Sequence, residues 1–340
     1  MVDKNTDFFK YVDNFSKTAN IPSIPIIKSK IDFIPKITIA IPTYKRADLL
    51  KESIDSALNQ IKYSEFDVIV VDNNPERDCE TEKLLYSYKN PQLSYYKNSQ
   101  NIQMAGNWNR LFTLAKAEYV VMLHDDDIIA PSFLNDCMQY INDEPDLGIL
   151  KPNSKSFIDG ESINFPNTKE ITKTKLQRIY DISNYNHFAL GAPSGCIFRK
   201  QAVLTVGGFN QELYPTMDIC FVTMFSNYFK VYKLNRVLSY YRWGFNESLN
   251  TSTITNFIYN DYYLRKQLLS KYKIPKIIIN IFLCYVTGYS IEFYKKINKE
   301  FDYDLKNLNL RGNHKITTLL SRAFIKLYIT IIIKMKKVDS

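Results

Sequence analysis

The stretch VVMLHDDDIIAP, residues 120–131, sets an apolar run directly before three adjacent aspartates, Asp125, Asp126 and Asp127. A continuous apolar run of this kind is typical of a buried strand. Three neighbouring carboxylates repel one another, so a strand end holds them only where a cation or hydrogen-bond donors offset the repulsion. The stretch therefore predicts either a site for a divalent cation or a helix N-terminus that Asp127 caps.

Strands and helices alternate along the sequence before this stretch. The patterns run in the order 36–42 (strand), 47–60 (helix), 66–72 (strand), 79–88 (helix), 93–97 (strand) and 105–117 (helix). This alternation predicts an α/β fold with a mostly parallel sheet covered by helices on both faces. Ligands of such sheets bind at the carboxyl ends of the strands, where PTYKR (42–46), DNNPE (72–76) and HDDDII (124–129) are expected to gather.

Composition narrows the class of protein. With 340 residues, 45% of them hydrophobic, the chain can bury a large core. The five cysteines lack C-x-x-C spacing and there are only three histidines, so neither a disulfide framework nor a zinc site is predicted. The first 15 residues lack the basic and then apolar pattern of a signal peptide, and we expect a protein of the reducing cytoplasm.

The positive charge is concentrated in the last quarter of the chain. Residues 251–340 carry 16 Lys and Arg against 6 Asp and Glu, a net charge of +10, whereas residues 1–250 carry 28 against 29, a net charge of −1. The basic residues are interleaved with the apolar runs 277–286 and 324–333. This mixture favours an anionic membrane surface over nucleic acid as the partner.

Residues 315–337 have the pattern of an amphipathic helix. The basic row comprises Lys315, Arg322, Lys326 and Lys337, and the apolar row largely opposite comprises Ile316, Leu320, Phe324, Leu327 and Ile331. No clean apolar run reaches the roughly 18–20 residues that a membrane span needs. We therefore predict a helix lying on a membrane surface, the alternative being a core-packing helix with a solvated basic face.

The same observations predict three parts of the chain. A loose N-terminal extension is expected over 1–35, which contains Pro22, Pro25 and Pro35. The α/β catalytic part is expected over 36–250, and a helical basic region over 251–340.

Four segments in order, IAIPTYKR, VIVVDNNP, GNWNRLFTLAKAEYVVMLHDDDIIAP and VGGFNQELYPTMD, make the chain similar to a known family. They resemble the signature segments of family 2 glycosyltransferases, inverting enzymes with the GT-A fold, over roughly residues 36–245. The resemblance implies a nucleotide-diphosphate-sugar donor, Mn²⁺ or Mg²⁺, and transfer to a hydroxyl acceptor.

The resemblance also implies roles for particular residues at the donor. The implied donor-binding residues are Pro42, Thr43, Tyr44, Arg46, Asp72, Asn73, Asn101, Asn107 and Asp125, with Gly106 and Asn109 in the same segment as Asn107. The implied metal residues are Asp125, Asp126 and Asp127. Asp126 would bind the metal, Asp125 would contact the ribose or a metal-bound water, and Asp127 would be an alternate ligand or support the ligands from behind. His124, where the family has an acid, is expected to pack, the alternative being a metal ligand. An Asx-turn at Asp72 and ordinary caps at the amides are the alternatives.

The remaining roles concern the acceptor. Asp218, before an apolar helix, is the implied general base, the alternative being a helix N-cap. In SYYRWGFNES (239–248), Arg242 would meet phosphate and Trp243 would stack on a sugar or pack in the core. Ser194 would border the acceptor.

Together these features predict a non-processive transferase. It would move a hexose or N-acetylhexosamine from a UDP-sugar to a polyprenyl-diphosphate-linked saccharide at the inner face of the cell membrane, in surface polysaccharide synthesis. A dTDP-rhamnosyltransferase of the same fold is the first alternative. A non-catalytic nucleotide-sugar-binding or scaffold protein and a metal-dependent phosphohydrolase are the others.

Overall fold

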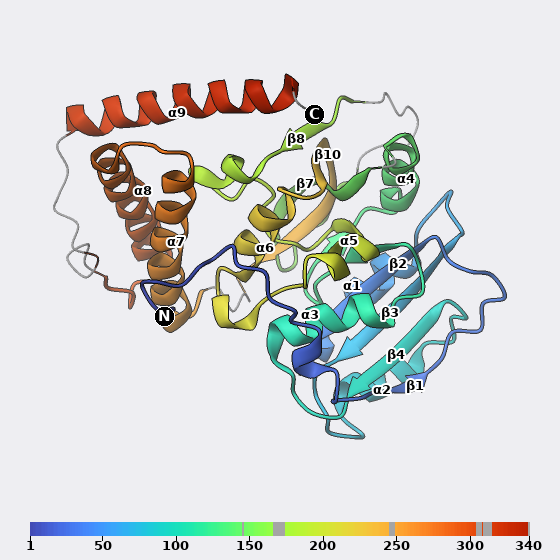
Figure 1. Cartoon of the computed structure of the whole chain (residues 1–340). Helices are drawn as coiled ribbons and strands as arrows, with labels where there is room; N and C mark the ends of the chain where they lie inside the picture. The colour runs from blue at the N-terminus through green and yellow to red at the C-terminus, as the bar shows by residue number, and fades with distance from the viewer. Residues whose placement is uncertain (145, 166–173, 245–248, 304–307, 309–314, 339–340) are drawn as a thin grey trace.

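The computed structural model describes residues 1–144, 146–165, 174–244, 249–303, 308 and 315–338. A sheet with helices on both faces forms the larger part, and three long helices stand beside it (Figure 1). The predicted α/β class is therefore confirmed. The strands are β1 (Ser23–Ile27), β2 (Ile37–Thr43), β3 (Phe66–Asp72), β4 (Leu93–Asn98), β5 (Tyr119–Met122), β6 (Ile128–Ile129), β7 (Leu147–Ile158), β8 (Gln177–Ile179), β9 (Cys196–Arg199) and β10 (Lys230–Trp243). The α-helices are α1 (Ala47–Leu58), α2 (Glu80–Ser87), α3 (Gln103–Leu114), α4 (Phe133–Asp143), α5 (Lys200–Thr205), α6 (Met217–Phe225), α7 (Thr251–Lys271), α8 (Lys276–Ile297) and α9 (Lys315–Val338).

The sheet has the strand order β1-β4-β3-β2-β5-β9-β7-β10-β6. Strands β4, β3, β2 and β5 are parallel, as the alternation predicts. Beyond β5 the sheet is mixed, because β9 runs antiparallel to both β5 and β7. Every residue of β2, β3 and β5 is buried, which explains why their sequences are continuous apolar runs rather than alternating ones.

Alternate side chains of these strands enter two separate apolar layers. Ile39 packs in a cluster with residues of α1 and α4 on one face. Its neighbour Ala40 packs in a cluster with residues of α3, α5 and α6 on the other. The period of two along a strand thus buries both faces of the sheet and fixes its register.

The segment after the aspartates is not a helix start. Ile128 and Ile129 form the short strand β6, which pairs with β10, and α4 begins only at Phe133 with Ser132 as its N-cap. Asp127 therefore does not cap this helix, and that alternative is wrong. The aspartates lie in the loop between β5 and β6, which we call the aspartate loop (His124–Asp127).

The first 27 residues form a strap that joins distant parts of the chain. β1 pairs with β4 at the edge of the sheet, and the Nδ2 of Asn14 donates to the carbonyl of Gly207 at 3.0 Å. The backbone N–H of Phe8 donates to Oε1 of Gln267 in α7 at 2.9 Å. The segment expected as a loose extension thus contacts both the sheet and the long helices.

The three long helices form their own apolar cluster. α8 packs on α7 and on α9, and its Phe282 and Leu283 are fully buried. α8 is long and apolar enough to cross a membrane, at a mean hydropathy of 1.4 over 18 residues, but 39% of that window is buried inside the protein. One helix that meets these criteria of length and composition is weak evidence for a span.

A turn at Gly207 and Gly208 connects α5 to the segment that carries Asp218. Both glycines have positive φ, +88° and +73°. Asn109 of α3 holds the turn by accepting from the Phe209 N–H and donating to its carbonyl, each at 2.8 Å. A Cβ on Gly207 would lie 2.1 Å from the carbonyl oxygen of Val12 in the strap.

Gly207→Ala is expected to destabilise the protein more than Gly160→Ala does. Both glycines have a backbone in the left-handed region, but a Cβ at Gly160, with φ +82°, would meet nothing within 4 Å. Gly160→Ala should cost about 1–2 kcal/mol of strain, whereas Gly207→Ala adds a backbone clash of about 1–3 kcal/mol more. Urea unfolding of the two variants measures the difference, and equal losses would contradict the predicted contact with the strap.

Candidate active site

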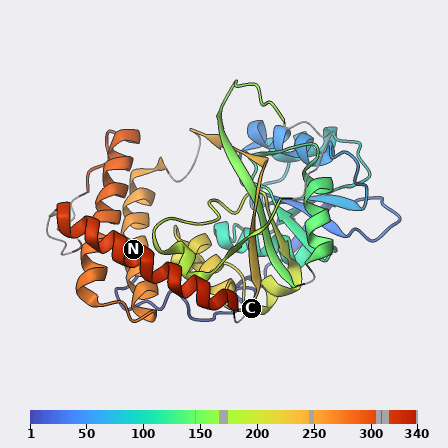
Figure 2. The ribbon, with the colours of Figure 1, turned by 90° about the horizontal axis from the view of Figure 1, so that it is seen from above.

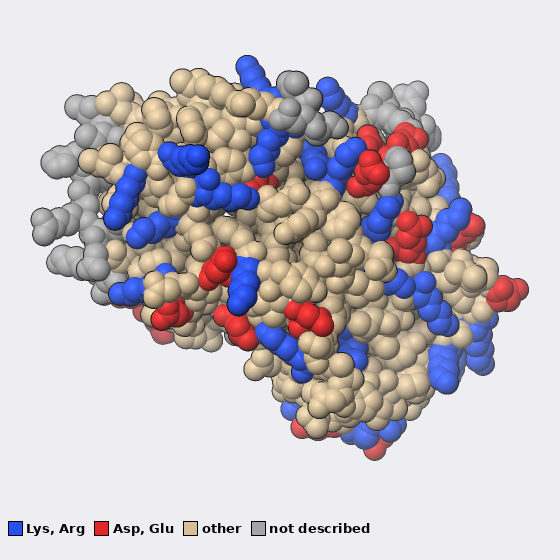
Figure 3. All heavy atoms as spheres, in the orientation of Figure 1, with Lys and Arg blue, Asp and Glu red and all other residues tan. Residues whose placement is uncertain are grey.

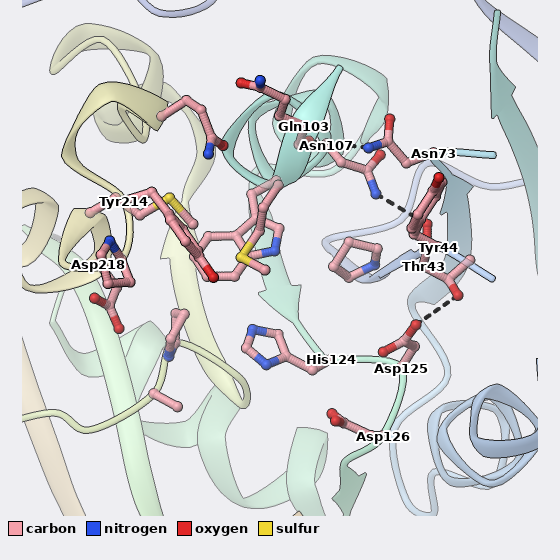
Figure 4. A pocket seen from close by; sticks show the side chains of 18 of the residues that line it. Thr43, Tyr44, Asn73, Gln103, Asn107, His124, Asp125, Asp126, Tyr214 and Asp218 are labelled. Carbon is pink, nitrogen blue, oxygen red and sulfur yellow. Dashed lines mark hydrogen bonds between the residues drawn. The ribbon is translucent and has the colours of Figure 1, made fainter. Parts of the chain in front are cut away.

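A cavity of about 680 Å³ opens at the carboxyl ends of β2, β3 and β5. Its walls come from the loops after β2 and β3, the start of α3, the aspartate loop and the first turns of α6 and α7. Figure 4 shows Asp125 and Asp126 on one side, Asp218 and Tyr214 on the other, and His124 between them. The volume is within the roughly 300–1,000 Å³ of small-molecule sites.

The structure brings most of the predicted site residues into this one cavity. Those that line it are Pro42, Thr43, Tyr44, Arg46, Asn73, Asn101, Asn107, Asp125, Asp126 and Asp218. Those that do not line it are Asp72, Asp127, Ser194, Arg242 and Trp243. Because the second group does not line the cavity, the roles these residues can have change.

Asp125 ties the aspartate loop to the loop after β2. Its Oδ2 accepts from the Oγ1 of Thr43 at 2.7 Å, and its Oδ1 lies 3.3 Å from Arg46 Nη1. The same guanidinium nitrogen lies 3.0 Å from Oδ2 of Asp126. Burial raises the pKa of Asp125 to about 6, although Arg46 opposes the shift. Arg46 is therefore the cation that offsets the repulsion between these two carboxylates.

Asp127 does not line the cavity, and one of its carboxylate oxygens meets a second donor. The backbone N–H of Arg242 donates to its Oδ1 at 2.9 Å, and burial, with Asp126 beside it, raises the pKa of Asp127. The Arg242 guanidinium donates to the carbonyl of Asp126 at 2.9 Å and to Glu52 at 2.8 Å, and contacts Asp159. Arg242 thus holds the aspartate loop from behind instead of facing the cavity.

Ser194 is also placed as a support for the loop. Its hydroxyl accepts from the backbone N–H of His124 at 3.0 Å. The buried ammonium of Lys151 donates to the Ser194 carbonyl, and burial lowers the pKa of Lys151. The sequence analysis does not predict this buried lysine, which lies in β7.

His124 packs and also lies close to the acids. Its ring stacks on Trp108 with 5.3 Å between centroids, and burial lowers the pKa of His124 to about 4, so that it is neutral near pH 7. Ligand atoms of His124, Asp126 and Asp127 lie within 4.8 Å of one another. Two carboxylates and a neutral imidazole are a suitable donor set for a divalent ion such as Mn²⁺ or Mg²⁺.

Asp72 is removed from the cavity by a buried ion pair. Its Oδ2 accepts from Lys97 Nζ at 2.9 Å and from the Tyr95 hydroxyl at 2.7 Å, and both charged side chains are at most 2% exposed. Its Oδ1 accepts from the Asn74 N–H at 2.8 Å, so the Asx-turn alternative is confirmed. Asp72 therefore holds the turn after β3, and its neighbour Asn73 lines the cavity surface.

A network of amides supports that surface. The Nδ2 of Asn98 donates to Asn73 at 3.1 Å and to Asn107 at 2.9 Å. Asn73 in turn donates to Oδ1 of Asn101 at 2.8 Å. The three predicted amides are thus held by one another and by a fourth, Asn98, that the sequence does not single out. Tyr44, 44% exposed, is the aromatic side chain beside them.

Asp218 lies in the first turn of α6, two residues after its N-cap Thr216. It is therefore not the cap, and that alternative is wrong. Burial raises the pKa of Asp218 to about 6, while the Ile219 N–H, which donates to its Oδ1 at 2.8 Å, opposes the shift. A carboxylate with such a pKa can take up a proton near neutral pH.

Several further lining residues were not predicted from the sequence. They are Gln103, Met104, Trp108, Ala192, Pro193, Gln211, Tyr214, Pro215, Met217, Tyr241 and Thr253. Trp108 lies inside the GNWNR segment and could have been identified there. Thr253 of α7 lies in the basic C-terminal region, and its hydroxyl is 3.4 Å from that of Tyr214.

Comparison with known proteins gives a family match. The model described as Glycosyl transferase family 2 matches residues 38–206. GalNAc(5)-diNAcBac-PP-undecaprenol beta-1,3-glucosyltransferase of Campylobacter jejuni is 27% identical over 214 residues. That match covers 62% of this chain and 66% of the relative, so it spans less than two thirds of the relative's length.

Solved structures support the fold. Staphylococcus aureus TarS 1-349 in complex with UDP has a TM-score of 0.55 at 17% identity, covering 80% of this chain and 77% of the other. Pyrobaculum calidifontis mannosyltransferase PcManGT, in complex with GDP-Man and Mn²⁺, has a TM-score of 0.50 at 14% identity, covering 94% and 90%. At these identities the similarity is one of fold.

Lys97→Met is expected to lower the free energy of unfolding by about 3–5 kcal/mol, because it leaves the Asp72 carboxylate buried without its cation. Lys83→Met is the control, since Lys83 pairs with Glu80 on the exposed surface of α2. It should leave stability unchanged. Urea denaturation of both variants measures the effect, and a small loss for Lys97→Met would show that Asp72 is hydrated in solution.

Proposed function

Because this chain is a family 2 glycosyltransferase, we propose that it is an inverting, non-processive enzyme that transfers one sugar from a UDP-sugar to a hydroxyl group. The observation that carries the proposal is the shared cavity, in which Asp218 faces the aspartate loop. Asp126 follows strand β5 and Asp218 lies in the first turn of α6, about 90 residues later in the sequence. This arrangement leaves room for a donor on one side and an acceptor on the other.

The donor is proposed to lie along the loops after β2 and β3. Tyr44 and the amide surface of Asn73, Asn101 and Gln103 would contact the base, and Asp125 the ribose. Arg46, already between two carboxylates, is positioned to meet the diphosphate as well. A hexose or N-acetylhexosamine is the proposed sugar.

The proposed metal ligand is Asp126, and Asp127 and His124 are the nearest additional donors. Asp125 is committed to Thr43 and Arg46, so we propose it as a tie to the nucleotide loop rather than a direct ligand. A bound Mn²⁺ or Mg²⁺ would neutralise charge on the departing diphosphate.

Asp218 is the proposed general base. Its carboxylate would take the proton of the acceptor hydroxyl as the acceptor oxygen bonds to the anomeric carbon of the sugar. The bond from that carbon to the phosphate oxygen breaks, and the UDP leaves with the electron pair. Attack from the side opposite the leaving group inverts the configuration, so an α-linked donor gives a β-linked product.

The proposed acceptor is a saccharide on a polyprenyl diphosphate, in surface polysaccharide synthesis of the O-antigen type. The name of the Campylobacter relative, which acts on a PP-undecaprenol-linked substrate, supports it. Such an acceptor places the enzyme on the cytoplasmic face of a membrane. We also propose the division of the chain into 1–35, 36–250 and 251–340, with Thr253 of the last part beside the acceptor side of the cavity.

The first alternative within the same fold is dTDP-rhamnose as donor. A panel of UDP-glucose, UDP-galactose, their N-acetyl forms and dTDP-rhamnose, each with Mn²⁺, distinguishes them by which nucleotide is released. Release from dTDP-rhamnose alone would replace the UDP proposal.

Asp218→Asn is expected to reduce transfer by about 10²–10⁴-fold with UDP binding retained, because the amide cannot accept the proton. In the unchanged protein, kcat should rise with pH through about 6 and then level off, since the base works only when deprotonated. Asp55→Asn, on the exposed side of α1, is the control. Undiminished transfer by Asp218→Asn would remove Asp218 from the mechanism.

Asp126→Asn is expected to weaken Mn²⁺-dependent UDP binding by at least about tenfold, because it removes the cavity-facing carboxylate of the proposed ligands. Calorimetric titration with UDP, with and without Mn²⁺, measures this without turnover. Asp55→Asn again serves as the control. If Mn²⁺ does not strengthen UDP binding to the unchanged protein, the metal proposal fails while the base proposal stands.

A further inference from the structure

Helix α9 presents one face to the body of the protein. Ile325 and Ile329 are at most 2% exposed in the cluster of the long helices. The guanidinium of Arg322 lies 4.3 Å from the ring centre of Tyr285 in α8, and the Tyr328 hydroxyl donates to the Tyr272 carbonyl at 3.2 Å. Lys336 donates to the buried Asp181 at 2.8 Å. The orientation of α9 is therefore fixed by contacts of several kinds.

A second face of α9 carries large apolar side chains that are exposed. We call this face the α9 stripe, and its residues are Leu320 (65% exposed), Phe324 (41%), Leu327 (65%), Ile331 (48%) and Met335 (62%). Their spacing of four, three, four and four residues puts them on one side of the helix, within roughly 80° of its circumference. Seen from above, α9 lies across α7 and α8 (Figure 2). The apolar row predicted from the sequence is thus exposed, although the side chains of Lys315 and Ile316 lie outside the described residues.

Cations lie on the same helix as the α9 stripe. Lys326, Lys334 and Lys337 are exposed. At about 100° per residue, Lys334 lies at the edge of the stripe, whereas Lys337 and Lys326 lie roughly 80–100° beyond that edge, on the polar side of the helix. The sequence of residues 315–338 has six Lys and Arg and no Asp or Glu. Figure 3 shows this part of the surface, at the upper left, as uncharged spheres interrupted by Lys and Arg.

We propose that the α9 stripe inserts into the surface of an anionic lipid bilayer, with α9 lying in the plane of the membrane. An apolar face, a polar face that carries lysines and no acid on the helix are the arrangement of interfacial helices. The apolar side chains enter the acyl boundary while the lysine stems keep their ammonium groups among anionic headgroups.

A second copy of the chain suits this surface less well. A two-fold contact between two α9 stripes would bring the same patch of each copy together, so two helices that each carry six Lys and Arg and no Asp or Glu would lie against each other. Like charges without acids between them oppose such a contact. A bilayer bearing negative charge meets both the apolar and the basic part of the surface.

This inference extends the proposed function, because a lipid-linked acceptor would be reached at that bilayer. It does not depend on the sugar or on the chemistry, since binding to vesicles requires neither donor nor acceptor. A failure of transfer therefore leaves it standing, and a failure of vesicle binding leaves the proposed reaction standing.

The test is flotation of the full chain with vesicles of phosphatidylcholine alone and with 30% phosphatidylglycerol. We expect binding to the anionic vesicles to exceed binding to the neutral ones by at least about tenfold, and to weaken in high salt. Leu327→Glu/Ile331→Glu should lower anionic binding by at least about tenfold, because two carboxylates enter the apolar ridge. Ile34→Glu/Ile61→Glu, which changes two exposed isoleucines elsewhere, is the charge-matched control and should bind normally.

Sedimentation of each variant without lipid, and hydrolysis of the UDP-sugar, establish that the variants fold. Equal vesicle binding by the stripe variant and the unchanged protein would overturn the proposal. So would absence of vesicle binding together with a dimer that Leu327→Glu/Ile331→Glu abolishes, because the stripe would then belong to an interface between two copies. Lys326→Gln/Lys334→Gln/Lys337→Gln should retain weak binding and lose the preference for anionic vesicles.

Discussion

Three adjacent carboxylates buried at the end of β5 are the constraint on which this structure depends. Removing negative charges from water is costly unless donors surround them, and each aspartate of the loop has its own set. Thr43 and Arg46 hold Asp125, Arg46 also holds Asp126, and the Arg242 backbone holds Asp127. The loop after β2, the loop after β5 and the end of strand β10 are therefore joined through these three carboxylates, and this junction forms part of the cavity wall.

Much of this could be predicted from the sequence because the relevant signals are local. Continuous apolar runs predict parallel strands such as β2, β3 and β5. The polar residues that follow them, Thr43, Asn73 and Asp125, are predicted at the site and line the cavity. The antiparallel strand β9 was not predicted, since a four-residue apolar run has no periodicity that distinguishes it. Likewise Ile128 and Ile129 become a strand only because β10 lies beside them.

The roles that changed are those that depend on long-range partners. Nothing near Asp72 in the sequence shows that Lys97 and Tyr95 will hold it in the core. We expect Arg242 at the acceptor from the resemblance and Ser194 there from its position in the sequence, but in the structure both donate to or accept from the aspartate loop and support it. Thr253 was assigned to a separate helical region, and only the packing of α7 brings it into the cavity wall.

The strap has a consequence for how the two halves of the cavity stay in register. It runs from α7, where the Val2 N–H donates to Asn260, past the Gly207 turn to the sheet edge at β4. One continuous peptide thereby links the helix carrying Thr253, the turn leading to Asp218 and the sheet carrying the nucleotide loops. A proteolytic nick within these residues would cut no lining side chain, yet it would release the tether that keeps the donor and acceptor sides at a fixed spacing. It would also leave β4 as an uncovered margin open to pairing with other chains.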